Sequence, residues 1–297
     1  MTETRGRESL SVDVEEYFHA TIFERRIDVS EWDARSGRAA PCVERLLDLF
    51  DEWGVRATFF TLGWYAERNG PLIRSIAERG HELGSHSRMH RLVYDLSRDE
   101  FREDARRSKQ AVEDASGVAV RGYRAPTFSI TARSLWALRI LAELGYEYDS
   151  SIFPIHHDRY GIPGFPAEPV VLELGGLTMA EFPASTVRVA GNELPISGGG
   201  YIRLLPWPLF RWALARHRRA GRFLNLYTHP WEIDPGQPRV PLPPVSAWRH
   251  YSGLDQVESR LAATVRGRSF LPLGERLPLE NAPHVAVGDD AWTLLEK

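Results

Sequence analysis

Two histidines and two carboxylates have the residue types and spacing of a metal site. His86 and His90 are four residues apart, so one helical turn would place both imidazoles on one face, where they could bind one ion. Asp13 and Glu15 alternate with valines in a strand-like segment and therefore share a face, which suits one metal ligand and one proton acceptor. Two histidines with one acid leave positions open for water and substrate, as catalytic metals require. The alternative interpretation is two pairs of ordinary surface groups.

Three further polar residues stand at the ends of strand-like segments. Arg124 lies just before Pro126, which restricts the backbone, so the guanidinium could be aimed at a carboxylate in bidentate geometry. His229 closes an apolar segment and could act as a general acid near neutral pH. Asp149 occupies a similar position. A surface arginine, a core histidine and a turn-forming aspartate are the alternative interpretations.

A repeated strand-then-helix pattern must position these residues. The sequence predicts strands at 10–14, 55–61, 82–85, 118–123, 146–148, 178–182 and 223–227. It predicts helices at 41–53, 64–79, 97–116, 130–144, 206–219 and 254–266. Such alternation favours an α/β fold with a parallel sheet, and seven strands predict a distorted, incomplete TIM-type (β/α)7 barrel with a C-terminal extension. Barrel enzymes place their active sites at the carboxyl ends of the strands, where the candidate residues fall.

The C-terminal part of the chain departs from this pattern. We expect the barrel to occupy residues 1–232 and an extension packed on it to occupy residues 233–297. The proline-rich segment 234–244 is expected to be extended, because proline cannot continue a helix or a central strand. The glycine-rich run 197–203 is predicted to be a flexible hinge or lid. The tail after Pro278 has few structural cues, and we expect it to be mobile.

The composition is that of an ordinary globular protein. The 297 residues include 43% hydrophobic and 26% charged residues, and the net charge of −3 offers no electrostatic footprint for nucleic acid. No apolar run approaches the ~20 residues of a membrane span. Cys42 is the single cysteine, which excludes an intramolecular disulfide and a cysteine-based zinc knuckle. The polar segment 1–8 shows no signal peptide, so we expect a cytoplasmic location, with contact to the inner face of the membrane only through partners.

Taken together, the motifs resemble polysaccharide deacetylases of the NodB-homology class, carbohydrate esterase family four. They follow the family's order over about residues 10–230, and the His-Ser-x-x-His motif is the most specific. The matches are Ser11-Val-Asp13, Thr58-Phe-Phe60, His86-Ser-x-x-His90, Arg124-Ala-Pro126 and Leu226-x-x-His229. The Asp-Val-Glu, Gly-Gly-Gly-Tyr-x-Arg and His-Pro-Trp-Glu segments also resemble a bacterial subgroup. Its members lie in exopolysaccharide (exosortase-associated) gene clusters and carry a C-terminal extension.

The resemblance implies a hydrolase that removes N-acetyl groups from an amino-sugar polysaccharide or its precursor. It implies one divalent metal ion, which we expect to be Zn²⁺. By position, it makes Asp13 the catalytic base, His86 and His90 metal ligands, Arg124 the group that orients the base, and His229 the general acid. The expected partner is an N-acetylated glycan, and the existence of a homo-oligomer is left open.

The acidic motif departs from the family pattern. Val14 stands where the usual motif has a second aspartate. Variants with a one-residue gap place the metal ligand at the next position, which is Glu15, and strand alternation favours the same residue. Glu16 would point away and is kept only as a substitute ligand. The family's fourth motif is not clearly matched, and Asp149 is our candidate for it.

Substrate contacts and the reaction class have alternatives. Tyr201 and Trp231 could stack on sugar faces, with Pro126 beside them, although core packing explains either aromatic residue equally well. A cyclic amide or imide hydrolase on the same scaffold resembles the gapped acidic motif as well. A sugar-binding module with a vestigial metal site is the third hypothesis, against which the complete set of acid, base and ligands argues.

Overall fold

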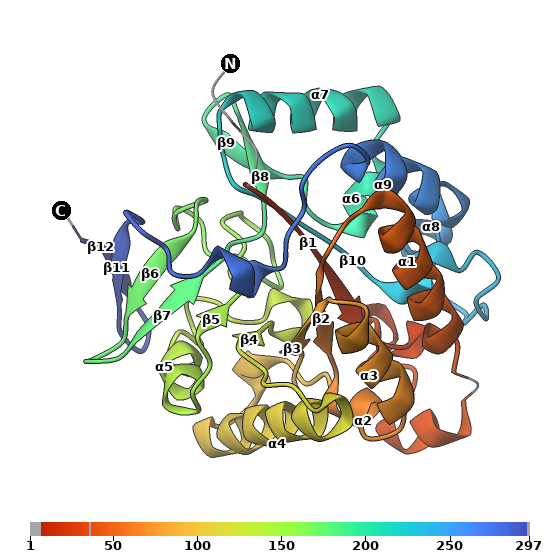
Figure 1. Ribbon diagram of the computed structural model, residues 1–297, viewed down its shortest axis with the longest axis horizontal. Coiled ribbons are helices and arrows are strands. Elements are labelled where there is room, and N and C mark those ends of the chain that lie inside the picture. Colours follow the sequence, from red (N-terminus) through yellow and green to blue (C-terminus); the bar gives the residue numbers. More distant parts are fainter. Residues whose placement is uncertain (1–6, 36, 296–297) are drawn as a thin grey trace.

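Seven parallel strands form the centre of the computed structural model, which describes residues 7–35 and 37–295 (Figure 1). Within these residues the strands follow the order β10-β1-β2-β3-β4-β5-β7, and each matches a predicted strand. Their bounds are β1 Glu8–Val14, β2 Thr58–Thr61, β3 Glu82–Ser85, β4 Gly122–Tyr123, β5 Tyr148–Asp149, β7 Thr178–Glu181 and β10 Leu224–Thr228. The prediction on a signal peptide concerns the polar segment 1–8. Residues 1–6 of this segment lie outside the described residues.

Side chains join the two outermost strands of this set. Asn225 on β10 donates from Nδ2 to the carbonyl oxygens of Phe182 and Pro183, which follow β7. Ser185 Oγ donates to the carbonyl of Phe223 and accepts the N–H of Asn225. The seven strands therefore curve until the first and last meet, without a main-chain ladder between them in the described part of the chain. The predicted distorted, incomplete (β/α)7 barrel is confirmed.

Helices cover the outside of the barrel. Val12 and Val14 on β1 face outward and are fully buried in the core beneath them. Figure 1 shows α1, α3, α4 and α5 on the outer side of β1 to β5. The helices are α1 Ala39–Trp53, α2 Gly63–Ala66, α3 Gly70–Glu78, α4 Arg98–Ser116, α5 Trp136–Glu143, α6 Gly199–Leu204, α7 Trp207–Arg219, α8 Pro244–Tyr251 and α9 Val257–Val265.

Apolar side chains fill part of the barrel interior. Phe60, Tyr148, Phe182 and Phe223 form a buried cluster, and Leu273 from the C-terminal part of the chain completes it. The backbone N–H of Leu273 donates to the side chain of a threonine at the start of β2. The C-terminal part of the chain thus contributes to the packing of the barrel.

Two helix predictions need correction, and helix α8 was missed. The predicted helix 64–79 is two helices, α2 and α3, because Pro71 lacks an N–H and fits the first turn of a new helix rather than the middle of a long one. The predicted helix 130–144 is regular only over α5. Helix α8 was not predicted: the proline-rich stretch ends at Pro243 and Pro244, which begin this helix.

Five strands outside the barrel were also not predicted. Strand β6 (Val170–Glu173) pairs antiparallel with β7, and the hairpin of β11 (His284–Val287) and β12 (Trp292–Leu294) extends the sheet beyond β6. Strands β8 (Thr186–Val189) and β9 (Asn192–Pro195) form a separate hairpin. We expect a mobile tail after Pro278, but β11 and β12 in this part of the chain pair as strands. Val285 on β11 is fully buried.

Among the described residues, no helix has both the length and the apolar character needed to cross a lipid bilayer.

Candidate active site

Three candidate metal ligands converge beyond the ends of β1 and β3. Glu15 follows β1, His86 follows β3, and one possible ligand atom each of Glu15, His86 and His90 lies within 4.8 Å of the others. Glu15 Oε2 is 2.9 Å from His90 Nε2. The side chains of Glu15 and His90 are 2% and 9% exposed. One carboxylate and two imidazoles in a buried setting form a candidate metal site.

The two histidines meet through a loop, and the predicted helical turn is wrong. Ser87 and His90 both have positive φ angles, 67° and 54°, which a right-handed helix does not contain. Backbone hydrogen bonds from Gly63 and Trp64 of α2 hold this loop in place. His86 Nδ1 lies 2.8 Å from the carbonyl oxygen of Arg124, which leaves Nε2 to face the cluster.

The ionisation of the cluster suits a divalent cation. Burial lowers the pKa of His86 to about 4, so this imidazole is neutral near pH 7, the form that binds metal. Burial alone would raise the pKa of Glu15, but the neighbouring His90, His229 and His86 outweigh it and hold the pKa well below the ordinary range. Glu15 Oε2 is buried, and its polar neighbour is His90 Nε2 at 2.9 Å. A buried carboxylate oxygen beside imidazole nitrogens fits a metal with nitrogen and oxygen ligands.

Asp13 lies beside this cluster, held by Arg124. Arg124 Nη1 donates to Asp13 Oδ1 at 2.8 Å and to Ser11 Oγ at 2.6 Å. Its remaining donors bind Ser150: Nε reaches the carbonyl at 3.1 Å and Nη2 reaches Oγ at 2.8 Å. The bidentate pair predicted for Arg124 is therefore wrong, since the serines take the other donors. Asp13 keeps Oδ2 free of the arginine.

His229 faces both carboxylates from the end of β10. Its Nε2 is 3.9 Å from Asp13 Oδ2 and 3.8 Å from Glu15 Oε1. Its Nδ1 is 3.2 Å from Glu232 Oε2. Burial lowers the pKa of His229, but the hydrogen bond and charge of Glu232, with the charges of Glu15 and Asp13, more than offset burial and raise the pKa to about 9. The imidazole therefore carries a proton near pH 7 and can donate it.

Glu232 is a site residue that the sequence analysis did not assign. It accepts hydrogen bonds from Thr228 Oγ1 and the His229 backbone, and Arg203 Nε donates to its other oxygen at 3.1 Å. A Cβ at Gly199 would overlap this carboxylate. The glycine-rich run is thus not the predicted hinge or lid: it forms the start of α6, where glycine lets the backbone approach Glu232. The signal was present in the His-Pro-Trp-Glu spacing and the arginine that ends the glycine-rich motif.

The three expected substrate contacts lie at different depths. Trp231 is 8% exposed, and its indole Nε1 donates to Glu15 Oε1 at 3.0 Å. Tyr201 is half-buried, with its hydroxyl 3.5 Å from that of Tyr160. Pro126 is buried at the start of a short 3-10 turn. Their roles as substrate contacts remain predictions.

Asp149 and Glu16 have partners of their own. Asp149 is fully buried and accepts from the Oγ and N–H of Ser151. Burial raises the pKa of Asp149, and burial together with the Asp149 charge raises that of Glu181 well above its ordinary value. Glu16 accepts the backbone N–H groups of Arg38 and Ala39 at the start of α1. Glu16 therefore serves the helix terminus, and the catalytic role of Asp149 remains a prediction.

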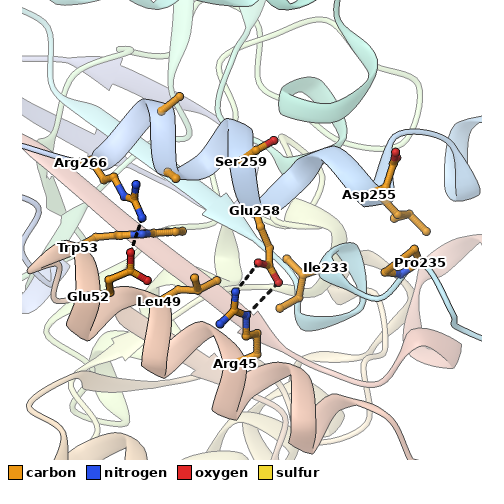
Figure 2. Close-up of a pocket in the computed structure, with 13 residues that line it drawn as sticks. Arg45, Leu49, Glu52, Trp53, Ile233, Pro235, Asp255, Glu258, Ser259 and Arg266 are labelled. Atoms are coloured by element: carbon orange, nitrogen blue, oxygen red, sulfur yellow. Dashed lines mark hydrogen bonds and ion pairs between the residues drawn. The ribbon is translucent and has the colours of Figure 1, made fainter.

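A separate groove of about 700 Å³ lies between α1 and α9 (Figure 2). Ion pairs from Arg45 to Glu258 and from Arg266 to Glu52 cross it. Its lining residues include no member of the candidate site, so the groove and the site are distinct.

The seven-stranded barrel carries a candidate metal site at its polar end, and two family models match the chain. Residues 32–148 match the model described as polysaccharide deacetylase, and residues 150–277 match a domain of unknown function, DUF3473. The chain carries a polysaccharide deacetylase domain of the NodB-homology class, carbohydrate esterase family four, followed by DUF3473. The predicted family is confirmed, and the exopolysaccharide-associated subgroup remains a prediction.

Curated relatives match part of the chain. Over 94 residues it is 31% identical to a peptidoglycan-N-acetylglucosamine deacetylase of Bacillus cereus, covering 31% of this chain and 34% of that protein. Over 116 residues it is 28% identical to a peptidoglycan deacetylase of Helicobacter pylori, covering 39% and 38%. A chitooligosaccharide deacetylase of Sinorhizobium fredii is 30% identical over 116 residues, covering 34% and 54%. The chain thus spans a little over a third of the first two relatives and about half of the third.

A solved structure supports the fold over nearly the whole chain. The crystal structure of a candidate polysaccharide deacetylase from Mycobacterium smegmatis aligns with a TM-score of 0.58 and 24% identity. The alignment covers 91% of this chain and 96% of the other.

The DUF3473 segment contributes to the barrel and to the site. Strands β7 and β10 fall within residues 150–277, as do His229, Trp231 and Glu232. The two family models meet near residue 149, whereas we expect a division after residue 232. The expected division remains a prediction.

Proposed function

We propose that this chain hydrolyses N-acetyl groups of amino sugars in a glycan, using one divalent cation held by Glu15, His86 and His90. The observation that carries the proposal is the position of His229 and Asp13 beside the same ligand cluster. An acid and a base then lie together beside one candidate cation, where both can act on the same acetyl group. The names of the relatives, which are peptidoglycan and chitooligosaccharide deacetylases, support the same substrate class.

We infer that the cation is Zn²⁺. Two imidazoles and a carboxylate, with positions left open, are the protein ligands that catalytic zinc sites use. When bound, the cation supplies Lewis-acid activation of a water molecule and of the acetyl carbonyl.

Asp13 accepts the proton of the attacking water. Its Oδ2 is available for this step, because Arg124 holds the other oxygen. Ser11 and Ser150 fix the guanidinium, so the base cannot turn away from the cluster.

His229 protonates the departing amine. As the new C–O bond forms and the amide C–N bond breaks, Nε2 gives its proton to the sugar nitrogen, and the products are acetate and an amino sugar. The hydrogen bond from Nδ1 to Glu232 keeps the ring protonated and oriented while Nε2 faces the site.

An acetate-release assay tests the proposal. Zinc-loaded protein is incubated with N-acetylglucosamine oligosaccharides and, in parallel, with a cyclic imide. We expect acetate from the oligosaccharides and no ring opening. Ring opening alone would support the imide hydrolase, and glycan binding without turnover would support the inactive sugar-binding module; either result contradicts the proposed function.

A further inference from the structure

Trp231 lies between two imidazole rings. Its ring centroid is 4.8 Å from that of His229 at an interplanar angle of 22°, and 4.7 Å from that of His250 at 25°. Both stacks are near-parallel, and Trp231 is only 8% exposed. A sugar stacks on an open aromatic face, and little of this indole is open.

The polar edge of the same indole binds the candidate metal carboxylate. Nε1 of Trp231 donates to Glu15 Oε1 at 3.0 Å, whereas Glu15 Oε2 faces His90 Nε2. The hydrogen bond therefore occupies one carboxylate oxygen and leaves the other for a cation. Groups that hydrogen-bond to metal ligands in this way fix the orientation of the ligand and tune the metal.

The segment after the barrel holds Trp231 in place. Gln237 Nε2 donates to the carbonyl oxygen of Trp231 at 2.8 Å, and Gln237 Oε1 lies 3.0 Å from His250 Nε2. His250 is 4% exposed on α8, and the ring of Phe23 packs against it edge-on with centroids 4.8 Å apart. A continuous series of contacts thus runs from α8 through His250 and Trp231 to Glu15.

We propose that Trp231 is a positioning residue for the metal ligand Glu15 and that His250 on α8 holds Trp231 in register. The inference rests on the metal site of the proposed function and adds a role for the C-terminal segment in building that site. It also replaces the sugar-stacking role expected for Trp231 from the sequence.

Trp231→Phe is the direct test, because it keeps an aromatic ring between the histidines and removes the N–H donor. Loss of a partner that orients a metal ligand costs about 10- to 100-fold in metal affinity. We expect the dissociation constant for Zn²⁺, measured by chelator competition, to rise by that factor. The absorption spectrum of the Co²⁺-loaded variant should differ from that of the Co²⁺-loaded parent chain, and the KM for the oligosaccharide should be unchanged.

His250→Ala is the second variant and serves as the test if Trp231→Phe does not fold. It should also weaken Zn²⁺ binding. Trp248→Phe is the matched control: Trp248 lies on the same helix and is 58% exposed, so metal affinity should not change. Wild-type Zn²⁺ affinity and an unchanged Co²⁺ spectrum in Trp231→Phe would overturn the inference, all the more if KM rises. Metal binding is measured without turnover. A chain that binds Zn²⁺ but releases no acetate would therefore refute the proposed function, while the effect of Trp231→Phe on Zn²⁺ affinity would still test the inference.

Discussion

Asp13 on β1 and Glu15 directly after it have different neighbours, and the neighbours decide the chemistry of the two carboxylates. Asp13 is bound by the cation Arg124, while Glu15 faces imidazoles and the Trp231 indole. Strand alternation is sufficient to predict that these two acids share a face. It cannot predict which nitrogen of Arg124 reaches Asp13, because that depends on Ser11 of the same strand together with Ser150, which follows β5.

Asp13→Asn tests the base. The amide keeps the size of the side chain and cannot accept the proton of water, so turnover should fall by about 10²–10⁴-fold. The variant should still bind Zn²⁺ in chelator competition, because Glu15, His86 and His90 are intact. Asp33→Asn, at a surface position paired with Arg68, should retain full activity as the control. Near-parental turnover in Asp13→Asn would remove Asp13 from its role.

Glu232→Gln tests the histidine as acid. A donor must be protonated, so activity should be lost as the pH rises through the pKa of His229, near 9. Glu232 raises that pKa, and its neutral replacement should move the alkaline limb of the kcat/KM profile to lower pH. Glu258→Gln, which removes only a surface ion pair with Arg45, should leave the limb in place. An alkaline limb that does not move in Glu232→Gln would exclude His229 as the titrating acid.

Glu232 also shows why part of the site escapes sequence reasoning. Its distance of three residues from His229 is visible, but its burial and its pairing with Arg203 arise from the contact of α6 with β10. The motif residues Asp13, His86, His90 and His229 could be found because their types are unusual at strand ends.

At the scale of elements, the start of α6 lies close against the Glu232 carboxylate. Gly199→Ala would place a methyl group on the Glu232 carboxylate, whereas a Cβ at Gly200 would meet no described atom within 4 Å. Displacing a supporting group by about 1 Å can cost on the order of 10²-fold in rate. We therefore expect Gly199→Ala to lose activity by that order and Gly200→Ala to remain near the parental rate, both measured as acetate release. Equal rates in the two variants would show that the close approach does not matter.

The barrel strands were predictable, and the edge strands were not. The seven central strands are short apolar segments between amphipathic helices, so pattern and spacing identify them. Strands β11 and β12 have mixed exposure and pair with each other, and β11 joins the sheet only through β6, a contact across more than a hundred residues. The local sequence does not indicate such a distant partner.

At the scale of the whole molecule, the C-terminal segment belongs to the barrel core. Leu273 is fully buried among the aromatic residues inside the barrel. Leu273→Ala should lower the free energy of unfolding by about 2–5 kcal/mol, through lost burial and the cavity left behind. Chemical denaturation should still show one transition, and Leu295→Ala, 41% exposed, should change little. A separate low-stability transition in Leu273→Ala would mean that the segment folds apart from the barrel.

The location and the partners of the molecule remain predictions. A net charge of −3 argues against a nucleic-acid partner. The cytoplasmic location and a homo-oligomer also remain predictions.

Anomalous diffraction at the zinc absorption edge, on crystals grown with Zn²⁺, tests the central claim most directly. We expect one dominant peak at bonding distance from Glu15, His86 and His90, with Asp13 and His229 on its flanks. A dominant peak elsewhere on the chain, or no peak at these three residues, would contradict it.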